Sequence, residues 1–369
     1  MSPIYVGVGT ADSEARSTTI GLPLLTADPS SPQVGDMYYS TTENWVRSYD
    51  GSAWVDSITD SLYTFSTYTF NEPDWGREGP SWSTLQTRYS GEPFLTTGNL
   101  VQGQHTGFHK LTLPRAATYE FEAAGAPGSR TGGYNAGRGI ILKGRMYFNE
   151  GDIIQFSIGK SGESDSSGYN GGGGGGTFIV KNEFFTSSQS DSNIILIAGG
   201  GSGGAYNTGT ANQDPQDAHA SKNGRNGQGT YRGNGGTNGN GGNGRGYGGN
   251  YGPAGPAAGI YSAATNFSSL GQYSPATAWK DGAQGARGYY AASGGGGHQS
   301  GFGCAGGGGN HAGGSGGGYS GGGGGGGNGE SSGGGGSFTD NLSSVSTVGY
   351  QGTGTVVKPA GGYVKITVV

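Results

Sequence analysis

Residues 193–204, NIILIAGGGSGG, contain the boundary between an apolar segment and a glycine-rich one. The four consecutive apolar residues at 194–197 are typical of a buried β-strand. Glycine follows this strand directly and dominates the sequence from Gly199 to about Gly336. We therefore expect a conventional β framework before this stretch, and a glycine region after it that depends on the framework.

The glycine content restricts how the second region can be ordered. The chain has 86 glycines in 369 residues, roughly three times the average usage of about 7%. Glycine loses more backbone entropy on folding than any other residue, and a hydrophobic fraction of 31% is too small to offset that loss over the whole length. The region is either disordered or ordered through backbone hydrogen bonds that need no side chains. We expect the ordered alternative.

Glycine recurs at every third position in three short runs, at 233–242, 246–255 and 282–288. Three is the period of the polyproline-II helix, which has no internal hydrogen bonds, so its buried backbone groups need partners on neighbouring helices. Collagen shares this period, but it requires long strict Gly-X-Y stretches with abundant proline. This chain has only 14 prolines, and its longest such runs cover about four repeats. The sequence predicts a bundle of laterally hydrogen-bonded glycine helices.

Short apolar or alternating segments outside the glycine region predict an antiparallel sandwich or jelly roll. They are FHKLTLP (108–114), ATYEFEAAGA (117–126), RGIILKGRMYFNEG (138–151), DIIQFSIGKSG (152–162), GTFIVKN (176–182) and NIILIAGG (193–200). The C-terminal GGYVKITVV (361–369) predicts one more framework strand, so both ends of the glycine region join one sandwich. Helix signals are almost absent; the best is 83–89, with Ser81 or Ser83 as its N-cap.

Residues 1–60 form a separate small β module in this interpretation. Strand candidates at 37–39, 45–46 and 53–55 surround the turn signal Asp50-Gly51. A meander of this size is too small to be stable alone, so we expect it to dock on a partner. The candidate docking residues are its aromatic side chains, Tyr38, Tyr39, Trp45 and Trp54.

Several segments resemble a known family. EAAGAPG (122–128), the stretch 140–163, GGGGGGTFIVKN (171–182) and ILIAGGGSGGAY (195–206) are similar to the glycine-rich domain of the anaplastic lymphoma kinase receptor ectodomain and its bacterial and phage relatives. The resemblance implies a TNF-like jelly roll at 61–198 plus 337–369, with a polyglycine-II helix bundle inserted at 199–336. It does not transfer a ligand or the receptor role, since no kinase domain or membrane helix is present in this sequence.

Two further similarities favour a phage protein. GDMYYSTT and SYDGSAWV, within 35–55, resemble short modules that recur in bacteriophage tail-fibre and virion proteins. Polyglycine-II bundles also occur in phage tail-tip adhesins, whose loops between helices contact the host surface. TNF-like folds often trimerise, whereas the insertion would cover that surface, so a homo-oligomer stays open.

Aromatic residues in the glycine region are the candidates for recognition, because they offer large contact area at low entropic cost. The largest interruption, IYSAATNFSSLGQYSPATAWKD (260–281), is either a packing plug or a recognition surface. The candidate recognition residues are Tyr261, Phe267, Tyr273, Trp279, Tyr289 and Tyr290. Packing against the flat faces of glycine helices is the alternative role for these side chains.

No catalytic, metal or cofactor constellation is expected. Gly199, Gly201 and Gly204 match G-x-G-x-x-G, but no helix pattern follows them to hold a pyrophosphate. His105 and His109 lack the helix and glutamate of a zinc protease. Asp214 and Asp217 lack calcium-loop spacing. Acidic residues cluster nowhere in the glycine region, which disfavours a glycan-cleaving enzyme.

The net charge, the cysteine count and the N-terminal sequence restrict the partners and the location of the protein. A formal net charge of −5 offers no polycationic surface for nucleic acid or an anionic membrane, although GRNGQGTYRGNGG resembles RNA-binding low-complexity segments. Cys304 is the only cysteine, and the N-terminus lacks signal-peptide features. We expect no membrane insertion and a virion protein made in the host cytoplasm.

The expected function is that of a non-enzymatic tail-fibre or fibre-tip component. Its N-terminal module contacts other virion proteins, and its loops contact a host-surface glycan or protein. The alternative is a purely structural virion component, such as a capsid decoration, head fibre or adaptor, without receptor binding.

Overall fold

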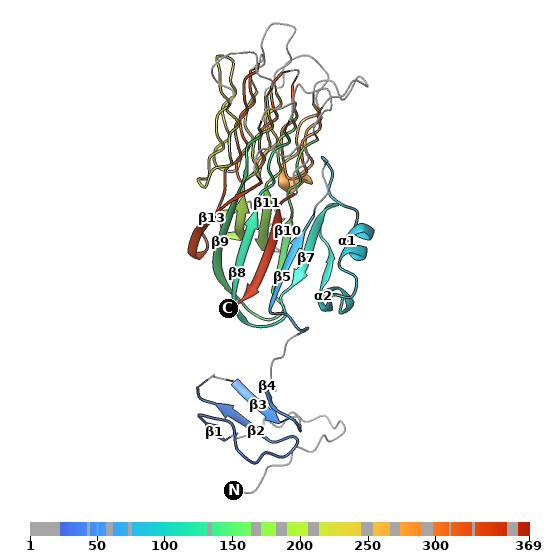
Figure 1. The fold of residues 1–369 in the computed structure, drawn as a ribbon, viewed down its shortest axis with the longest axis vertical. Coiled ribbons are helices and arrows are strands. Elements are labelled where there is room, and N and C mark those ends of the chain that lie inside the picture. Colours follow the sequence, from blue (N-terminus) through green and yellow to red (C-terminus); the bar gives the residue numbers. More distant parts are fainter. Residues whose placement is uncertain are drawn as a thin grey trace. The chain divides into compact units, whose positions relative to one another are not determined.

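The structure is a computed structural model (Figure 1). It describes residues 23–42, 45–49, 51–56, 62–72, 76–130, 135–163, 171–181, 190–205, 214–244, 254–265, 274–288, 298–309, 311–326, 329–352 and 361–369. The chain divides into two compact units, Met1–Ser61 and Leu62–Val369. The described residues are mainly β, with two short α-helices, as the sequence predicts.

The smaller unit is one twisted sheet around an aromatic pair. Its strands, in sheet order, are β1 (Leu24–Leu25), β2 (Met37–Ser40), β3 (Trp45–Tyr49) and β4 (Trp54–Asp56). The pairs β2–β3 and β3–β4 are antiparallel, whereas the two-residue β1 runs parallel to β2. Tyr38 is buried edge-on against Trp54, with ring centroids 5.0 Å apart. These few buried groups form a small core.

The larger unit contains two five-stranded sheets in which every strand pair is antiparallel. The first has the order β12 (Ile194–Ala198), β11 (Thr177–Lys181), β10 (Ile153–Ser157), β7 (Phe108–Thr112), β6 (Leu100–Gln102). The second has the order β13 (Ser343–Gln351), β9 (Gly139–Phe148), β8 (Ala117–Ala124), β14 (Tyr363–Val368), β5 (Thr67–Asn71). The C-terminal strand β14 is therefore an inner strand of its sheet, between β8 and the edge strand β5.

A first hydrophobic core lies between the two sheets. Phe121 and Val364 of the second sheet pack in one buried cluster with Phe156 and Leu196 of the first. Two short helices, α1 (Trp82–Arg88) and α2 (Pro93–Thr96), add Leu85 and Phe94 to the same cluster. The Ser81 hydroxyl accepts the N–H of Thr84 and caps α1, in agreement with the predicted N-cap.

A second core covers the outer face of the first sheet. All five residues of β12 are buried, because Ile195 and Leu196 belong to the first core while Ile194 and Ile197 belong to the second. Residues of the glycine region supply the other side of the second core: Ala258, Ile260, Ala276, Trp279, Ala283, Ala286, Phe302, Cys304 and Tyr319. Burial on both faces explains why the strand at 194–197 is continuously apolar.

The glycine runs extend from one end of these sheets (Figure 1) and bond laterally with a period of three. Five successive N–H groups of run 199–204 donate to three neighbouring segments: Gly200 and Gly203 to Gly317 and Gly314, Gly201 and Gly204 to Ala126 and Ser129, Ser202 to Gln216. Its carbonyls accept from three others: Gly199 and Ser202 from Ile140 and Gly137, Gly201 and Gly204 from Gly174 and Gly171, Gly200 from Gly335. The run therefore has six hydrogen-bonded neighbours, and every third residue faces the same one.

The runs are not confined to the insertion after β12. Segments 125–130, 158–163 and 171–176, which connect framework strands, bond into the same array. Contact between runs is so close that a Cβ on Gly175 would lie 1.6 Å from the carbonyl oxygen of Phe302. Glycine is required there because a methyl group would overlap the neighbouring backbone.

Candidate functional site

The glycine runs end together on the side away from the sheets. Residues that border the undescribed segments of this region are mutual neighbours: the N–H of Gly171 donates to Gly204, that of Gly204 to Ser129, that of Glu163 to Gln299, and that of Gly308 to His298. Gly244 and Thr265, which border two further segments, are also hydrogen-bonded. The chain therefore enters and leaves these segments at one end of the array.

Four of the predicted recognition residues belong to those segments. Phe267, Tyr273, Tyr289 and Tyr290 lie outside the described residues. The described residues next to them, Thr265, Ser274 and Gly288, are part of the array: Thr265 bridges to Asn243, and Ser274 to Arg287.

The other two predicted recognition residues are described, and Trp279 is a packing residue. Its side chain is fully buried, stacked 4.8 Å from the ring of Phe108 and 5.6 Å from that of Phe178. The indole N–H donates to the Ser157 hydroxyl at 2.8 Å. This placement contradicts display of Trp279 for recognition, because the side chain is fully buried, stacked on two phenylalanines and hydrogen-bonded through its indole N–H.

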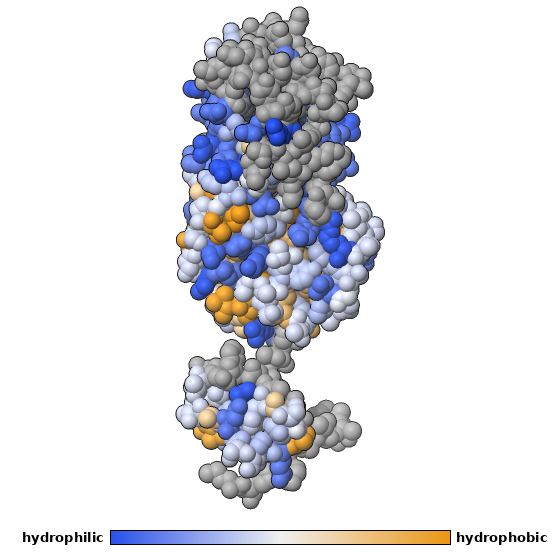
Figure 2. All heavy atoms as spheres, in the orientation of Figure 1, coloured by the Kyte–Doolittle hydropathy of each residue, from blue (hydrophilic) through white to orange (hydrophobic). Residues whose placement is uncertain are grey.

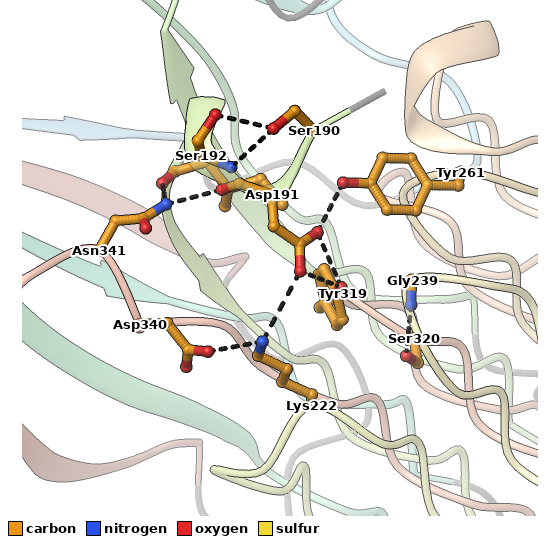
Figure 3. A network of polar contacts seen from close by, with 11 residues as sticks. Ser190, Asp191, Ser192, Lys222, Gly239, Tyr261, Tyr319, Ser320, Asp340 and Asn341 are labelled. Atoms are coloured by element: carbon orange, nitrogen blue, oxygen red, sulfur yellow. Dashed lines mark hydrogen bonds and ion pairs between the residues drawn. The ribbon is translucent and has the colours of Figure 1, made fainter. Parts of the chain in front are cut away.

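Tyr261 belongs to a polar network around Asp191, where the first sheet meets the glycine runs (Figure 3). Its hydroxyl donates to Asp191 Oδ1 at 2.6 Å, and the Tyr319 hydroxyl donates to the same carboxylate at 2.8 Å. The pKa values of both phenols are raised, first by burial and then by these bonds to a carboxylate. Tyr261 is only partly exposed. Its hydroxyl connects the glycine region to Asp191, which precedes β12.

Lys222 completes the Asp191 network from a second run. Its ammonium lies 2.5 Å from Asp340 and 3.6 Å from Asp191, and 4.7 Å above the ring of Phe338. The hydrogen bond to Asp340 is the main cause that raises the lysine pKa. The Asn341 amide donates to the carbonyls of Asp191 and Ile194. The Lys222 ammonium is therefore the cation of this network. The network connects the start of β12 and the residues before it to residues 340–341.

The two histidines of HTGFH, His105 and His109, have different surroundings. His109 is fully buried, stacked 4.5 Å from Phe156, with Nε2 3.5 Å from a carboxylate oxygen of buried Glu72. Burial lowers the pKa of His109 to about 3. His105 instead contacts the carbonyl of Lys280 at 3.0 Å.

Asp217 forms an ion pair with Arg138 at 2.7 Å and accepts its backbone N–H. No cluster of three or more metal-ligating side chains occurs among the described residues. After the G-x-G-x-x-G match at 199–204, the next long described stretch, 214–244, contains no helix.

The predicted docking residues of the smaller unit are only partly at its surface. Tyr38 is buried, and its hydroxyl donates to Asp28, so it is a core residue and not a docking residue. Tyr39 and Trp54 are half-buried, and Trp54 donates its indole N–H to the carbonyl of Pro29. The side chain of Trp45 lies outside the described residues.

Two aliphatic residues of the smaller unit are more exposed than its described aromatic side chains. Leu24 is 70% and Val34 is 76% exposed. Neither was among the predicted docking residues, because they lie in a proline-punctuated stretch where no periodic pattern marks a surface.

The chain matches no protein-family model, and no curated protein shows significant similarity to it. Among the described residues, no helix is long and apolar enough to cross a membrane.

Proposed function

We propose that the glycine region is a bundle of polyglycine-II helices carried by a TNF-like jelly roll. The hydrogen bonds of run 199–204 support this, since a period of three with six lateral neighbours is the pattern expected of packed polyproline-II helices without side chains. The two antiparallel sheets around one core are compatible with a jelly roll.

We propose that the protein is a structural and adhesive component of a bacteriophage virion, a tail fibre or fibre tip, and not an enzyme. The observation that carries this proposal is the common end of the glycine runs, where rigid, buried backbone holds the borders of several connecting segments together. Recognition loops are commonly positioned by rigid scaffolds. Phe267, Tyr273, Tyr289 and Tyr290 are the candidates for contact with a host-surface glycan or protein.

We further propose that the smaller unit attaches the protein to other virion proteins. Its core is small and it exposes Leu24 and Val34, which is what a module completed by a partner would expose. Tyr39, Trp45 and Trp54 remain candidates for this contact.

A purely structural spacer or capsid decoration is the second candidate, because the glycine array is held by backbone bonds that do not depend on any displayed loop. Cell binding separates the two. Labelled full-length protein is expected to stain host cells and to compete with particle adsorption, and a chain lacking residues 1–60 to stain without joining particles. Full-length protein that joins particles but stains no cells would leave only the spacer.

A further inference from the structure

Three neighbouring glycine runs, 223–227, 233–236 and 240–244, present one outward face. Backbone hydrogen bonds connect them in antiparallel order: Gly224 to Gly236, Gly227 to Gly233, and Asn243 to Asn234. The last two runs are joined by a tight turn in which Asn238 and Gly239 both have positive φ, the geometry that an Asn-Gly turn favours. The arrangement is a small three-stranded layer on the side of the array.

This layer buries its glycines and exposes its amides. Gly233, Gly236, Gly239 and Gly242 are buried, at the three-residue period noted in the sequence. The side chains between them, together with two from the first run, form what we call the asparagine face: Asn223, Asn226, Asn234, Thr237 and Asn240, which are exposed, and Asn243, which is half-buried. The described surface of the glycine runs visible in Figure 2 is largely hydrophilic, in line with this composition.

Two of these amides are held in a fixed orientation by the neighbouring run. The N–H of Gly235 donates to Asn226 Oδ1 at 2.8 Å, and the N–H of Asn234 donates to Asn243 Oδ1 at 2.6 Å. A backbone N–H can only donate, so the oxygen of each amide must face it. The NH₂ group of each side chain, with two donors, is thereby directed away from that bond.

The spacing of the face is regular. Three residues of a polyproline-II run rise about 9 Å, and hydrogen-bonded extended chains lie about 5 Å apart. The six side chains are uncharged and offer both donors and acceptors, and one of them, the Asn240 amide, already donates to the carbonyl of Thr237 at 3.1 Å. Tyr231, 42% exposed, lies in the link between the first two runs and adds an apolar ring at the end of the face.

We propose that the asparagine face binds an extended neutral glycan, an assignment that rests on the adhesive function proposed above. Sugar hydroxyls require donors and acceptors held at fixed spacing, which prepositioned amides supply with little entropy to lose. Arg225 lies half-buried in the first run and Arg232 is exposed in the link beside it, so binding of an anionic glycan is the outcome that the anionic arm of the test decides. An apolar partner would call for a larger hydrophobic area. A purely structural role, in which the amides only satisfy backbone N–H groups, is the competing account.

The variant Asn226→Asp/Asn243→Asp separates the two accounts. Each aspartate keeps the oxygen that accepts the backbone N–H, but replaces the outward NH₂ donor with a second acceptor. The variant Asn71→Asp/Asn149→Asp, at exposed positions of the sandwich, makes the same charge change as a control. Asn223→Ala removes an exposed side chain of the face without touching either backbone bond.

The probe is an array of neutral oligosaccharides of hexoses and N-acetylhexosamines, with sialylated and sulfated glycans as the anionic arm. Full-length protein and the control are expected to bind neutral glycans equally, and the Asn226/Asn243 variant at least about tenfold more weakly. Asn223→Ala is expected to weaken binding with an unchanged thermal midpoint. Equal binding by all variants, binding of anionic glycans alone, or no binding to the array would overturn the proposal.

Cell staining distinguishes failure of the site from failure of the function. If the Asn226/Asn243 variant stains host cells as well as the unaltered protein does, the asparagine face is refuted and the adhesive function stands. If the full-length protein binds neutral glycans through this face but stains no cells, the site stands and the adhesive function fails.

Discussion

The larger unit contains two regions that are ordered by opposite means. Between the sheets, side chains such as Phe121, Phe156 and Leu196 fill the space, and the strands keep the separation that large side chains require. In the glycine array the space is filled by backbone alone, and a Cβ at most glycine positions would overlap a neighbouring carbonyl. The core between the sheets depends on packed side chains, whereas the glycine array requires that side chains be absent.

The comparison shows that burial and hydrophobicity are separable. Buried backbone N–H and C=O groups cost free energy only when they lack partners. In run 199–204 all six N–H groups donate and five carbonyls accept hydrogen bonds across neighbouring segments. The array can therefore be dense and buried with almost no apolar side chains. Serines within it are satisfied too: the Ser315 hydroxyl donates to the carbonyl of Gly255 or of Gly323.

The strongest way to break the array is to add one methyl group. In Gly175→Ala the new Cβ would start 1.6 Å from the Phe302 carbonyl oxygen, and no rotamer change can relieve a clash with backbone. We expect a loss of stability larger than the about 3–5 kcal/mol of deleting a buried aromatic ring, seen as a failure to fold or a large drop in thermal midpoint.

Gly255→Ala is the matched control for that experiment, because its Cβ would meet nothing closer than 3.2 Å. If Gly175→Ala unfolds at the same temperature as Gly255→Ala, the close approach of the runs is wrong.

The contact between the two regions depends on a side chain, so removing that side chain should cost less than the methyl insertion. Trp279→Ala removes an indole stacked between Phe108 and Phe178. We expect a loss of about 3–5 kcal/mol in chemical unfolding. Tyr147→Ala, at a position 61% exposed on β9, should change the free energy of unfolding by less than about 0.5 kcal/mol. If Trp279→Ala keeps its stability but loses cell binding, the packing role is contradicted and Trp279 is a recognition residue.

Acid should lower the free energy of unfolding through His109, which is buried in the sandwich. Burial lowers the pKa of His109 to about 3 in the folded state, against about 6.5 in the unfolded chain. The unfolded state therefore binds more protons between these values, and stability present above pH 6.5 is lost as the pH falls toward 3. His109→Gln should flatten this part of the pH–stability curve. Glu72 and Arg88 act on the same histidine, so a curve unaffected by the substitution would assign the dependence to other groups.

The smallest effect is expected at the network that joins β12 to the runs. Asp191→Ala removes the acceptor of the Tyr261 and Tyr319 hydroxyls, which should cost about 1–3 kcal/mol. Asp340→Ala leaves those bonds intact and removes an exposed partner of Lys222, so it should cost less than about 1 kcal/mol. Equal losses from the two substitutions, measured by urea unfolding, would contradict the assignment of the tyrosine bonds as the stronger contribution.

The framework was largely predictable because its signals are local. The apolar run at 194–197, the alternating segments and the Ser81 cap each carry their structure in adjacent residues, and the expected strands and the expected helix form there. Strands β6 and β13 and helix α2 were not predicted. The burial of every third glycine at 233–242 was predictable for the same reason: a fixed period along one run sets which residues face its neighbours.

The roles of individual aromatic residues were not predictable. Trp279 lies in a stretch that reads equally well as a plug or as a displayed loop. Its partners Phe108 and Phe178 are more than 100 residues earlier in the chain, and nothing in the composition near Trp279 identifies them. Tyr38 was assigned to a surface for a similar reason: Tyr38 and Tyr39 are adjacent in β2 and therefore lie on opposite faces of the sheet, and the sequence does not show which face is buried.

By itself the sequence determined that the chain is mainly β, that the region after Ala198 is ordered by glycine, and that its runs repeat with a period of three. These follow from residue type and spacing along the chain. Only the tertiary structure decided which run neighbours which, that segments 125–130, 158–163 and 171–176 join the array, and that asparagines of three runs share one face. Polyglycine backbone is chemically uniform, so the pairing of runs is set by where the framework strands place their ends.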